Sequence, residues 1–241
     1  MTGDGDVAAA ARERCDAWDD MHRFYFPDYD QRWQVAVELI GRAVEGRALP
    51  RVLDLGCGPG TLTRRLSQVL PLTCVLGIDG DPLLVDMARA LPGSALLSYR
   101  RARVGSASTV VLLQDLAPFD AIVSSAFVHY FDTGQLARLH ALCRRLLAPD
   151  GLLVTVERFS DAGGGGGPAG EDPWSRWWVD TYAHPLFSGY VDRVEGRCRM
   201  SEPLPLPRWS YASLLREARF ADVSSTVLPA GSAVVAARPC R

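Results

Sequence analysis

Lysine is absent from the sequence, so all 26 basic residues are arginine. This excludes the chemistries that need a lysine amine, including Schiff-base formation and the phosphate-binding lysine of a P-loop. Cysteine occurs six times, but no C-x-x-C pair is present and no cysteine has a zinc-like spacing to the four histidines. We therefore expect reduced thiols, no metal site and a cytoplasmic location.

Long apolar runs are also missing. No segment approaches the roughly 18 consecutive apolar residues of a membrane span, and the N-terminus has neither the basic start nor the apolar stretch of an export signal. The net charge is -2, which gives no overall attraction to nucleic acid or to an anionic membrane. The sequence thus predicts a small-molecule partner, with no nucleic acid and no membrane, and a monomer or homodimer.

The residues that are present suit one α/β domain, with 48% hydrophobic and 22% charged side chains in 241 residues. Strand and helix patterns alternate between residues 51 and 158. This alternation predicts a parallel sheet covered by helices on both faces, with ligands at the carboxyl ends of the strands. The third strand is either Ala95 to Tyr99 or Val110 to Leu113, and both remain open. The other predicted strands are Arg51 to Leu55, Thr73 to Ile78, Ala121 to Val123 and Leu152 to Val156, and the predicted helices are Thr61 to Leu70, one opened by Asp81-Pro82, and Gln135 to Leu147.

Four regions follow along the chain. Residues 1–48 are predicted as an N-terminal helical lid, 49–158 as the cofactor-binding core, 159–207 as an insert over the active site, and 208–241 as a last helix with a terminal strand pair. The insert contains five consecutive glycines, Gly163 to Gly167, which favour a mobile linker over a phosphate cradle. Its aromatic residues either line a ligand pocket or pack a lid on the sheet. They are Trp174, Trp177, Trp178, Tyr182, Phe187 and Tyr190.

The most informative string is VLDLGCGPG, residues 52–60, a strand that runs into a glycine-rich turn and a helix. Glycines let the backbone turn sharply and let a ligand lie against it. The third glycine of a dinucleotide fingerprint would fall on Thr61, and the G-K-[ST] ending of a P-loop is missing. Asp54 stands two residues before the first glycine, which suits a ligand with an ammonium group better than one with phosphates.

On this string the sequence resembles the class I S-adenosylmethionine-dependent methyltransferases of the small-molecule type, and the resemblance extends from Tyr29 to Pro239. It implies a Rossmann-like, doubly wound, mostly parallel seven-stranded sheet with an antiparallel terminal strand, an N-terminal helical lid and an aromatic-rich insert after strand 5. It also implies S-adenosylmethionine as cofactor and S-adenosylhomocysteine as product, without a metal.

The resemblance assigns cofactor roles residue by residue. Asp79, at the end of the second strand, accepts hydrogen bonds from both ribose hydroxyls. Asp115 accepts from the adenine amino group, and Leu116 offers its backbone amide to the ring. Ser125 faces the sulfonium, and Tyr29 closes over the cofactor. Each also fits an ordinary role, as a turn or loop acid, a helix cap or a packed helix residue. The full set of cofactor-binding candidates is Tyr29, Asp54, Gly56, Cys57, Gly58, Gly60, Asp79, Gly80, Asp115, Leu116 and Ser125.

An activated methyl-sulfonium needs little catalytic apparatus beyond positioning the nucleophile and excluding water. A base helps only when the acceptor must lose a proton. His129 is the first candidate because it lies just past the fourth strand, although it also fits as a packed helix-start residue. Glu157 and Tyr130 are predicted at the same edge of the sheet. The substrate-binding candidates are Tyr25, His22, Trp178, Tyr182 and Arg199.

The predicted function is methyl transfer to an oxygen or nitrogen nucleophile of a small, partly apolar molecule, in the setting of natural-product biosynthesis. One alternative keeps the cofactor but uses the sulfonium for cyclisation or decarboxylation. Another is a tRNA-modifying methyltransferase, because Gly189-Tyr190 and Arg199 resemble the carboxymethyl-transferring enzymes of the wobble uridine. The negative net charge and the absence of lysine weigh against it.

Overall fold

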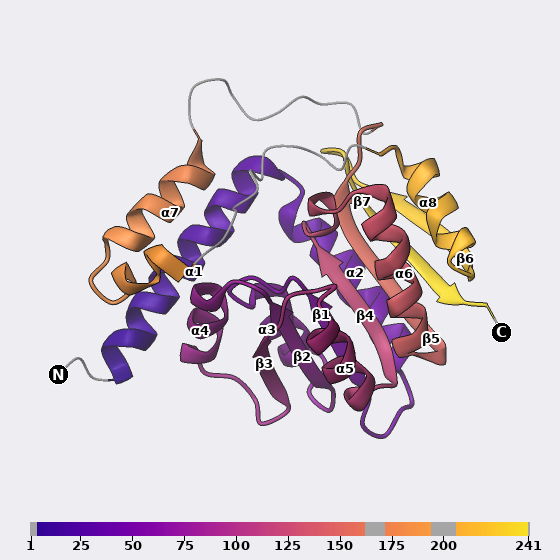
Figure 1. Ribbon diagram of the computed structural model, residues 1–241, viewed down its shortest axis with the longest axis horizontal. Helices are drawn as coiled ribbons and strands as arrows, with labels where there is room; N and C mark the ends of the chain where they lie inside the picture. The colour runs from indigo at the N-terminus through magenta and orange to yellow at the C-terminus, as the bar shows by residue number, and fades with distance from the viewer. Residues whose placement is uncertain (1–3, 162–171, 194–205, 241) are drawn as a thin grey trace.

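The computed structural model describes residues 4–161, 172–193 and 206–240. Within them the strands form one seven-stranded sheet in the order β3-β2-β1-β4-β5-β7-β6 (Figure 1). Strands β1 to β5 are parallel, and β7 pairs antiparallel with both β5 and β6. The order reverses between β1 and β4, which places a ligand crevice at their carboxyl ends. The strands are β1 Arg51–Leu55, β2 Cys74–Asp79, β3 Leu97–Arg101, β4 Phe119–Ser125, β5 Leu147–Arg158, β6 Phe220–Val227 and β7 Ser232–Pro239.

Helices cover both faces of the sheet, as the alternation predicted. Helices α2, α3 and α4 contribute to the core on one face, and α5, α6 and α8 to the core on the other. Helix α1 packs on α4 and α7 (Figure 1). The helices are α1 Asp4–Tyr25, α2 Tyr29–Val44, α3 Thr61–Val69, α4 Pro82–Ala90, α5 Ala107–Leu116, α6 Thr133–Leu146, α7 Pro173–Ala183 and α8 Arg208–Glu217, with 3-10 turns at Val128–Tyr130 and Ser188–Arg193. No helix in these ranges is long and apolar enough to cross a membrane.

Strand residues alternate between the two cores. Val52 of β1 faces the core under α2, while the next residue, Leu53, faces the core under α6. Ala121 and Ile122 of β4 divide in the same way. Because both of their faces are buried, the central strands β1, β2 and β4 are mostly apolar, which explains why they were recognisable from the sequence.

The third strand is β3, Leu97–Arg101, which overlaps the first of the two predicted segments. Val110 to Leu113 is wrong as a strand, because it lies inside α5. The side chain of Ser106 caps this helix by accepting a hydrogen bond from the Thr109 amide. Thr109 and Leu113 are its buried residues, four positions apart, so the burial follows the helical period.

The end of the chain is as predicted. Helix α8 precedes the strand pair of β6 and β7, and Arg219, between them, has a φ of 66°. This is the left-handed conformation for which glycine is usual. The Asp81-Pro82 start of α4 is also confirmed, since the Asp81 carboxylate accepts from the amides of Leu83 and Leu84 at 2.9 and 3.3 Å. Gly163 to Gly167 lie outside the described residues.

Candidate cofactor and acceptor site

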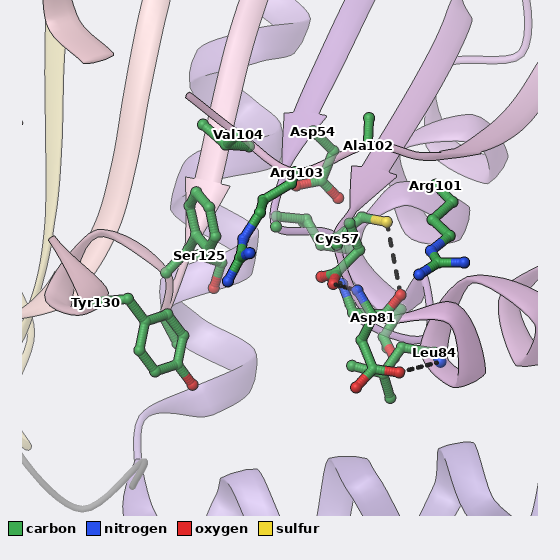
Figure 2. Close-up of a pocket in the computed structure, with 18 of the residues that line it drawn as sticks. Asp54, Cys57, Asp81, Leu84, Arg101, Ala102, Arg103, Val104, Ser125 and Tyr130 are labelled. Carbon is green, nitrogen blue, oxygen red and sulfur yellow. Dashed lines mark hydrogen bonds between the residues drawn. The ribbon is translucent and has the colours of Figure 1, made fainter. Parts of the chain in front are cut away.

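One large cavity of about 1160 Å³ opens at the carboxyl ends of β1, β2 and β4. Its wall includes the glycine turn, the ends of the neighbouring strands with the residues that follow them, the starts of α4, α5 and α6, the first two helices, and α7. Figure 2 shows Arg103 extending between Ser125 on one side and Cys57 on the other. The predicted cofactor residues on its wall are Tyr29, Asp54, Gly56, Cys57, Gly58, Asp79, Gly80 and Ser125.

The glycine turn after β1 is fixed by the strand beside it. The amides of Gly56 and Cys57 both donate to the carbonyl of Ile78, at 2.9 and 3.0 Å. Gly56 has a φ of 69°, and a Cβ atom there would lie 2.1 Å from the ring of Phe127. Only glycine fits this position, because a side chain would be strained and would also collide with that ring.

Asp79 ends β2 at the edge of the turn. Its Oδ2 accepts from the Gly58 amide at 2.9 Å and its Oδ1 from the Asp81 amide at 2.8 Å. Burial raises the pKa of Asp79 to about 6, against the lowering effect of these amides. Each carboxylate oxygen keeps acceptor capacity for a further donor, so the group can still bind hydroxyls of a ligand.

Asp54 is the second buried acid of the cavity wall. It is 1% exposed and its Oδ2 accepts from the Thr63 hydroxyl at 2.6 Å. Burial raises the pKa of Asp54 to about 7, and the charge of Asp79 contributes to this rise. Two acids that are desolvated side by side favour a ligand that brings positive charge or hydrogen-bond donors.

Helix α1 covers the glycine turn. The Trp18 ring lies so close to Gly58 that a Cβ atom there would come within 3.3 Å of it. One turn later, His22 Nδ1 is 2.8 Å from the Trp18 carbonyl, which requires Nδ1 to carry the hydrogen. Burial lowers the pKa of His22 to about 3, so its ring is neutral near pH 7. Both side chains line the cavity.

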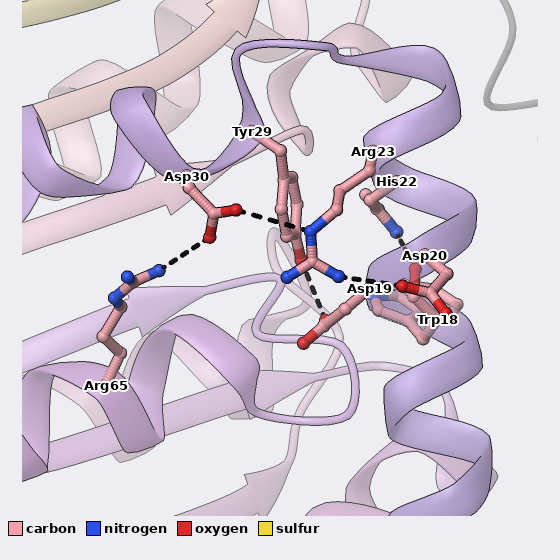
Figure 3. Close-up of polar contacts among 8 residues, drawn as sticks. All are labelled: Trp18, Asp19, Asp20, His22, Arg23, Tyr29, Asp30 and Arg65. Carbon is pink, nitrogen blue, oxygen red and sulfur yellow. Dashed lines mark hydrogen bonds and ion pairs between the residues drawn. The ribbon is translucent and has the colours of Figure 1, made fainter.

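Figure 3 shows the polar contacts between helix α1 and the neighbouring helices α2 and α3. The Tyr29 hydroxyl of α2 donates to Asp19 of α1 at 2.9 Å. Arg23 of α1 and Arg65 of α3 both pair with Asp30 of α2, at 3.4 and 3.3 Å. Burial raises the pKa of Asp19. These contacts tie three helices together beside the cofactor end of the cavity.

The rim after β4 carries the predicted catalytic residues. Tyr130 and Ser125 line the cavity, and the Trp33 indole donates to the Ser125 hydroxyl at 3.1 Å. His129 Nδ1 pairs with Glu157 Oε2 at 3.0 Å, with side-chain exposures of 5% and 1%. His129 Nε2 has no hydrogen-bond partner among the described residues. The pair lies behind the cavity wall, since neither residue lines it.

The structure does not bring Asp115 and Leu116 to the cavity. They end α5, just before β4 begins, and Leu116 borders a small surface pocket with Arg51 and Cys74, the first residues of β1 and β2. This is the opposite edge of the sheet, so the predicted adenine contact does not fit. The cavity wall includes instead Ala102 and the residues around it, which follow β3.

The predicted substrate residues divide. His22 and Trp178 line the cavity. Tyr25 and Tyr182 do not line it. The Tyr25 hydroxyl donates to Asp172 at 2.9 Å, and the Tyr182 ring stacks on Trp178. Arg199 lies outside the described residues. Gly60, a predicted cofactor residue, shapes the turn from behind the wall, where a Cβ atom would lie 2.5 Å from the Tyr99 hydroxyl oxygen.

Sequence reasoning missed several residues of the cavity wall. They are Trp18, Arg32, Trp33, Ala102, Arg103 and Phe127. Assigning β3 correctly would have pointed to Ala102 and Arg103, which follow its last residue. The others come from helices or turns whose distance from the glycine turn no sequence pattern indicates.

The cavity fits S-adenosylmethionine by the chemistry of its wall. The turn leaves no side chain at Gly56 and Gly58, and Asp79 and Asp54 offer acceptors to hydroxyl and ammonium donors. In the described part of the chain, no cluster of at least three His, Cys, Asp or Glu side chains suits a metal ion.

Comparisons with known proteins find methyltransferases. Residues 52–151 match the family described as methyltransferase domain. Over 131 residues the chain is 34% identical to the trans-aconitate 2-methyltransferase of Methylobacterium nodulans, covering 54% of this chain and 46% of that protein. The chain thus spans about half the length of the curated relatives it matches first.

Two solved structures share the fold. The apo S-adenosylmethionine-dependent methyltransferase SibL superposes with a TM-score of 0.57 at 21% identity, covering 86% of this chain and 55% of SibL. Human N-acetylserotonin methyltransferase in complex with S-adenosylmethionine gives 0.55 at 18% identity, covering 87% and 53%. These likenesses show the fold, and the sequence match to a methyltransferase domain covers residues 52–151 of the chain.

Proposed function

We propose that the protein transfers a methyl group from S-adenosylmethionine to an oxygen or nitrogen nucleophile of a small, partly apolar molecule. The observation that carries this is a single cavity shared by the glycine turn, the buried carboxylate of Asp79 and an aromatic wall. The cofactor supplies an activated methyl group on its sulfonium. The protein's part is to bind, orient and exclude water.

The cavity wall suggests which residues hold each part of the cofactor. Gly56 and Gly58 accommodate its amino-acid end, and Asp79 accepts from the sugar hydroxyls. Ala102 and the flanking Arg103 replace Asp115 and Leu116 as the residues proposed to contact the adenine. Tyr29 and Ser125, which both line the cavity, are proposed to face the sulfonium.

The acceptor lies on the α7 side in this proposal. Trp174 and Trp178 present aromatic surface there, which suits a molecule with an apolar or aromatic part. The name of the Methylobacterium relative indicates a carboxylic acid as its substrate, so a carboxylate is one candidate oxygen nucleophile for this chain. A natural-product setting and a monomeric or homodimeric state stay predictions.

The first test is cofactor binding by calorimetry with S-adenosylmethionine and S-adenosylhomocysteine. We expect micromolar binding of both, weakened about tenfold to a hundredfold by Asp79→Ala, because hydrogen bonds to a charged group are lost. Asp180→Ala, on the exposed face of α7, is the matched control and leaves binding unchanged. Absence of heat with either ligand would contradict the proposal.

His129 is proposed as the base for acceptors that lose a proton, with Glu157 hydrogen-bonded to its Nδ1. Because the pair lies behind the cavity wall in this structure, this proposal requires a side-chain movement that brings His129 Nε2 into the cavity. We expect His129→Gln to lower kcat by about a hundredfold or more for such acceptors, with the KM for the cofactor unchanged. His184→Gln, at the end of α7, is the control. Unaltered kcat in His129→Gln would assign the pair a packing role.

The same assays separate methyl transfer from the alternative chemistry of cyclisation or decarboxylation. Methyl transfer releases one S-adenosylhomocysteine per turnover, whereas the alternatives leave the cofactor intact. Mass spectrometry of the cofactor pool during turnover therefore distinguishes them.

A further inference from the structure

Arg32, in the first turn of α2, is a cation on the wall of the cavity. It is 0% exposed and has the largest volume of the fully buried side chains described. Its guanidinium carbon lies 3.9 Å from the ring centre of Phe26 and 4.8 Å from that of Tyr29. The two aromatic faces attract the charge and hold the group in place.

The rings do not satisfy the hydrogen bonds of this group. None of Nε, Nη1 and Nη2 of Arg32 has a hydrogen-bond partner among the residues that the structure describes. Burial lowers the pKa of Arg32 to about 10, which still leaves it positively charged near pH 7. A buried cation with unused donors is costly unless something pairs with it.

The nearby carboxylates are engaged elsewhere. Glu157 uses Oε2 for His129 and Oε1 for the Arg158 amide, each at 3.0 Å. Asp28 accepts from the amide and the hydroxyl of Ser232, at 3.1 and 2.5 Å. Both acids act on Arg32 through their charge, but neither is hydrogen-bonded to it in this structure.

We propose that Arg32 binds an anionic group of the methyl acceptor, a carboxylate, so that the substrate class is organic acids. This rests on the proposed function and adds a substrate-binding residue to it. The planar guanidinium matches a carboxylate with two parallel hydrogen bonds. A carboxylate paired in this way is a weak nucleophile, so the methylated atom is a different oxygen or nitrogen of the same molecule.

The surroundings of Arg32 suit an acid that is otherwise apolar. His22 and Trp33 also line the cavity, and His22 is neutral. The buried acids Asp54 and Asp79 lie at the cofactor end, so the wall has a negative end and a positive end. Because the guanidinium is fully covered here, we expect anion binding to involve a side-chain rotation at the wall.

The test compares acids with uncharged analogues of similar shape, in the presence of S-adenosylhomocysteine and by calorimetry. The probes are 3-hydroxybenzoate with 3-hydroxybenzamide, phenylacetate with phenylacetamide, and trans-aconitate with its trimethyl ester; inorganic phosphate tests for a simple anion. We expect at least one acid to bind about tenfold or more tightly than its neutral analogue, and Arg32→Met to remove that preference. Arg42→Met, exposed on the same helix, is the matched control and keeps it.

If no acid is preferred, if only inorganic phosphate binds, or if Arg32→Met keeps the preference, the proposal is overturned. Failure of the proposed function looks different, because the wild-type protein would then give no heat with S-adenosylmethionine. The acid preference is also measured without the cofactor product, so the two failures remain separable.

Thermal unfolding without ligand gives a second reading that needs no knowledge of the acceptor. Methionine replaces the unpaired charge with an apolar chain of similar length. We expect Arg32→Met to match or exceed the wild-type unfolding temperature, as replacement of buried charge by apolar groups often does, with Arg42→Met unchanged. A fall of several degrees would show that Arg32 is needed for the fold and would overturn the proposal.

Discussion

At the scale of single residues, burial governs the charges at the site. Asp54 and Asp79 are both desolvated at the same turn, and their pKa values rise to about 7 and about 6. Such acids destabilise the ligand-free protein while they are ionised. A cofactor with an ammonium group and sugar hydroxyls offsets that cost, so the desolvation of the two acids favours binding.

The raised pKa of Asp54 leads to a pH-dependent prediction for Asp54→Asn. Above about pH 7 the wild-type protein carries an ionised, buried carboxylate at Asp54. As the pH falls from 7 toward 4, the folded state takes up a proton there before the unfolded state does, so the wild-type protein becomes more stable. The amide of the variant does not titrate, so the variant lacks this gain. We therefore expect Asp54→Asn to be more stable relative to wild type at pH 8 than at pH 5. The difference between the two free energies of unfolding should change by on the order of 1–3 kcal/mol.

Urea unfolding at the two pH values measures this difference. His22 and His140, whose pKa values burial lowers to about 3 and about 4, reduce stability as the pH falls below about 6.5, but they do so in both proteins and cancel. Asp180→Asn serves as the exposed control. An equal stability difference at both pH values would show that Asp54 is ionised throughout.

Single residues also mark the limit of what the sequence could reveal. The glycine turn was recognisable because its residues are consecutive. The reasons that Gly56 and Gly60 must be glycine are Phe127 and Tyr99, which lie far away in the sequence. The burial of Arg32 was equally hidden, since arginine is ordinarily exposed.

At the scale of elements, the strands that form the switch point were predictable and α5 was not. Buried parallel strands are short apolar runs between turns, and β1, β2 and β4 have this form. Val110 to Leu113 is also a short apolar run, and only its Ser106 cap separates it from a strand. That ambiguity affected the site as well, because placing Asp115 after a strand would have put it at the ligand edge.

The two N-terminal helices have different roles, although both were predicted as a lid. Helix α2 packs on the sheet beside β5 and β7, and Arg47, just after it, pairs with Asp120 and Asp150 at 2.6 and 2.7 Å. Helix α1 instead lies over the glycine turn. A helix that buries one face against a sheet and one that buries it against other helices have the same period, so the sequence could not distinguish them.

At the scale of the whole molecule, the site joins segments that are distant along the chain. Trp18 of α1 contacts three tryptophans of α7, with ring centres 4.8 to 6.3 Å apart. The Trp177 indole donates to the carbonyl of Arg14 at 2.9 Å. Helix α7, which follows β5, thus packs on the first helix (Figure 1), and both helices contribute side chains to the cavity wall.

This arrangement predicts which segments become more protected from hydrogen exchange when the cofactor binds. Because Trp18 and the turn of residues 56–60 bound the same cavity, we expect S-adenosylhomocysteine to slow amide hydrogen exchange in both the turn and the middle of α1, while β6 and α8 at the far end of the sheet are unchanged. Hydrogen-exchange mass spectrometry measures this directly. In Trp18→Ala the turn should remain protected and α1 should not, since the ring that links them is gone; Trp209→Ala, exposed on α8, is the control. Protection confined to the turn in the wild-type protein would mean that α1 packs over the cavity without responding to its ligand.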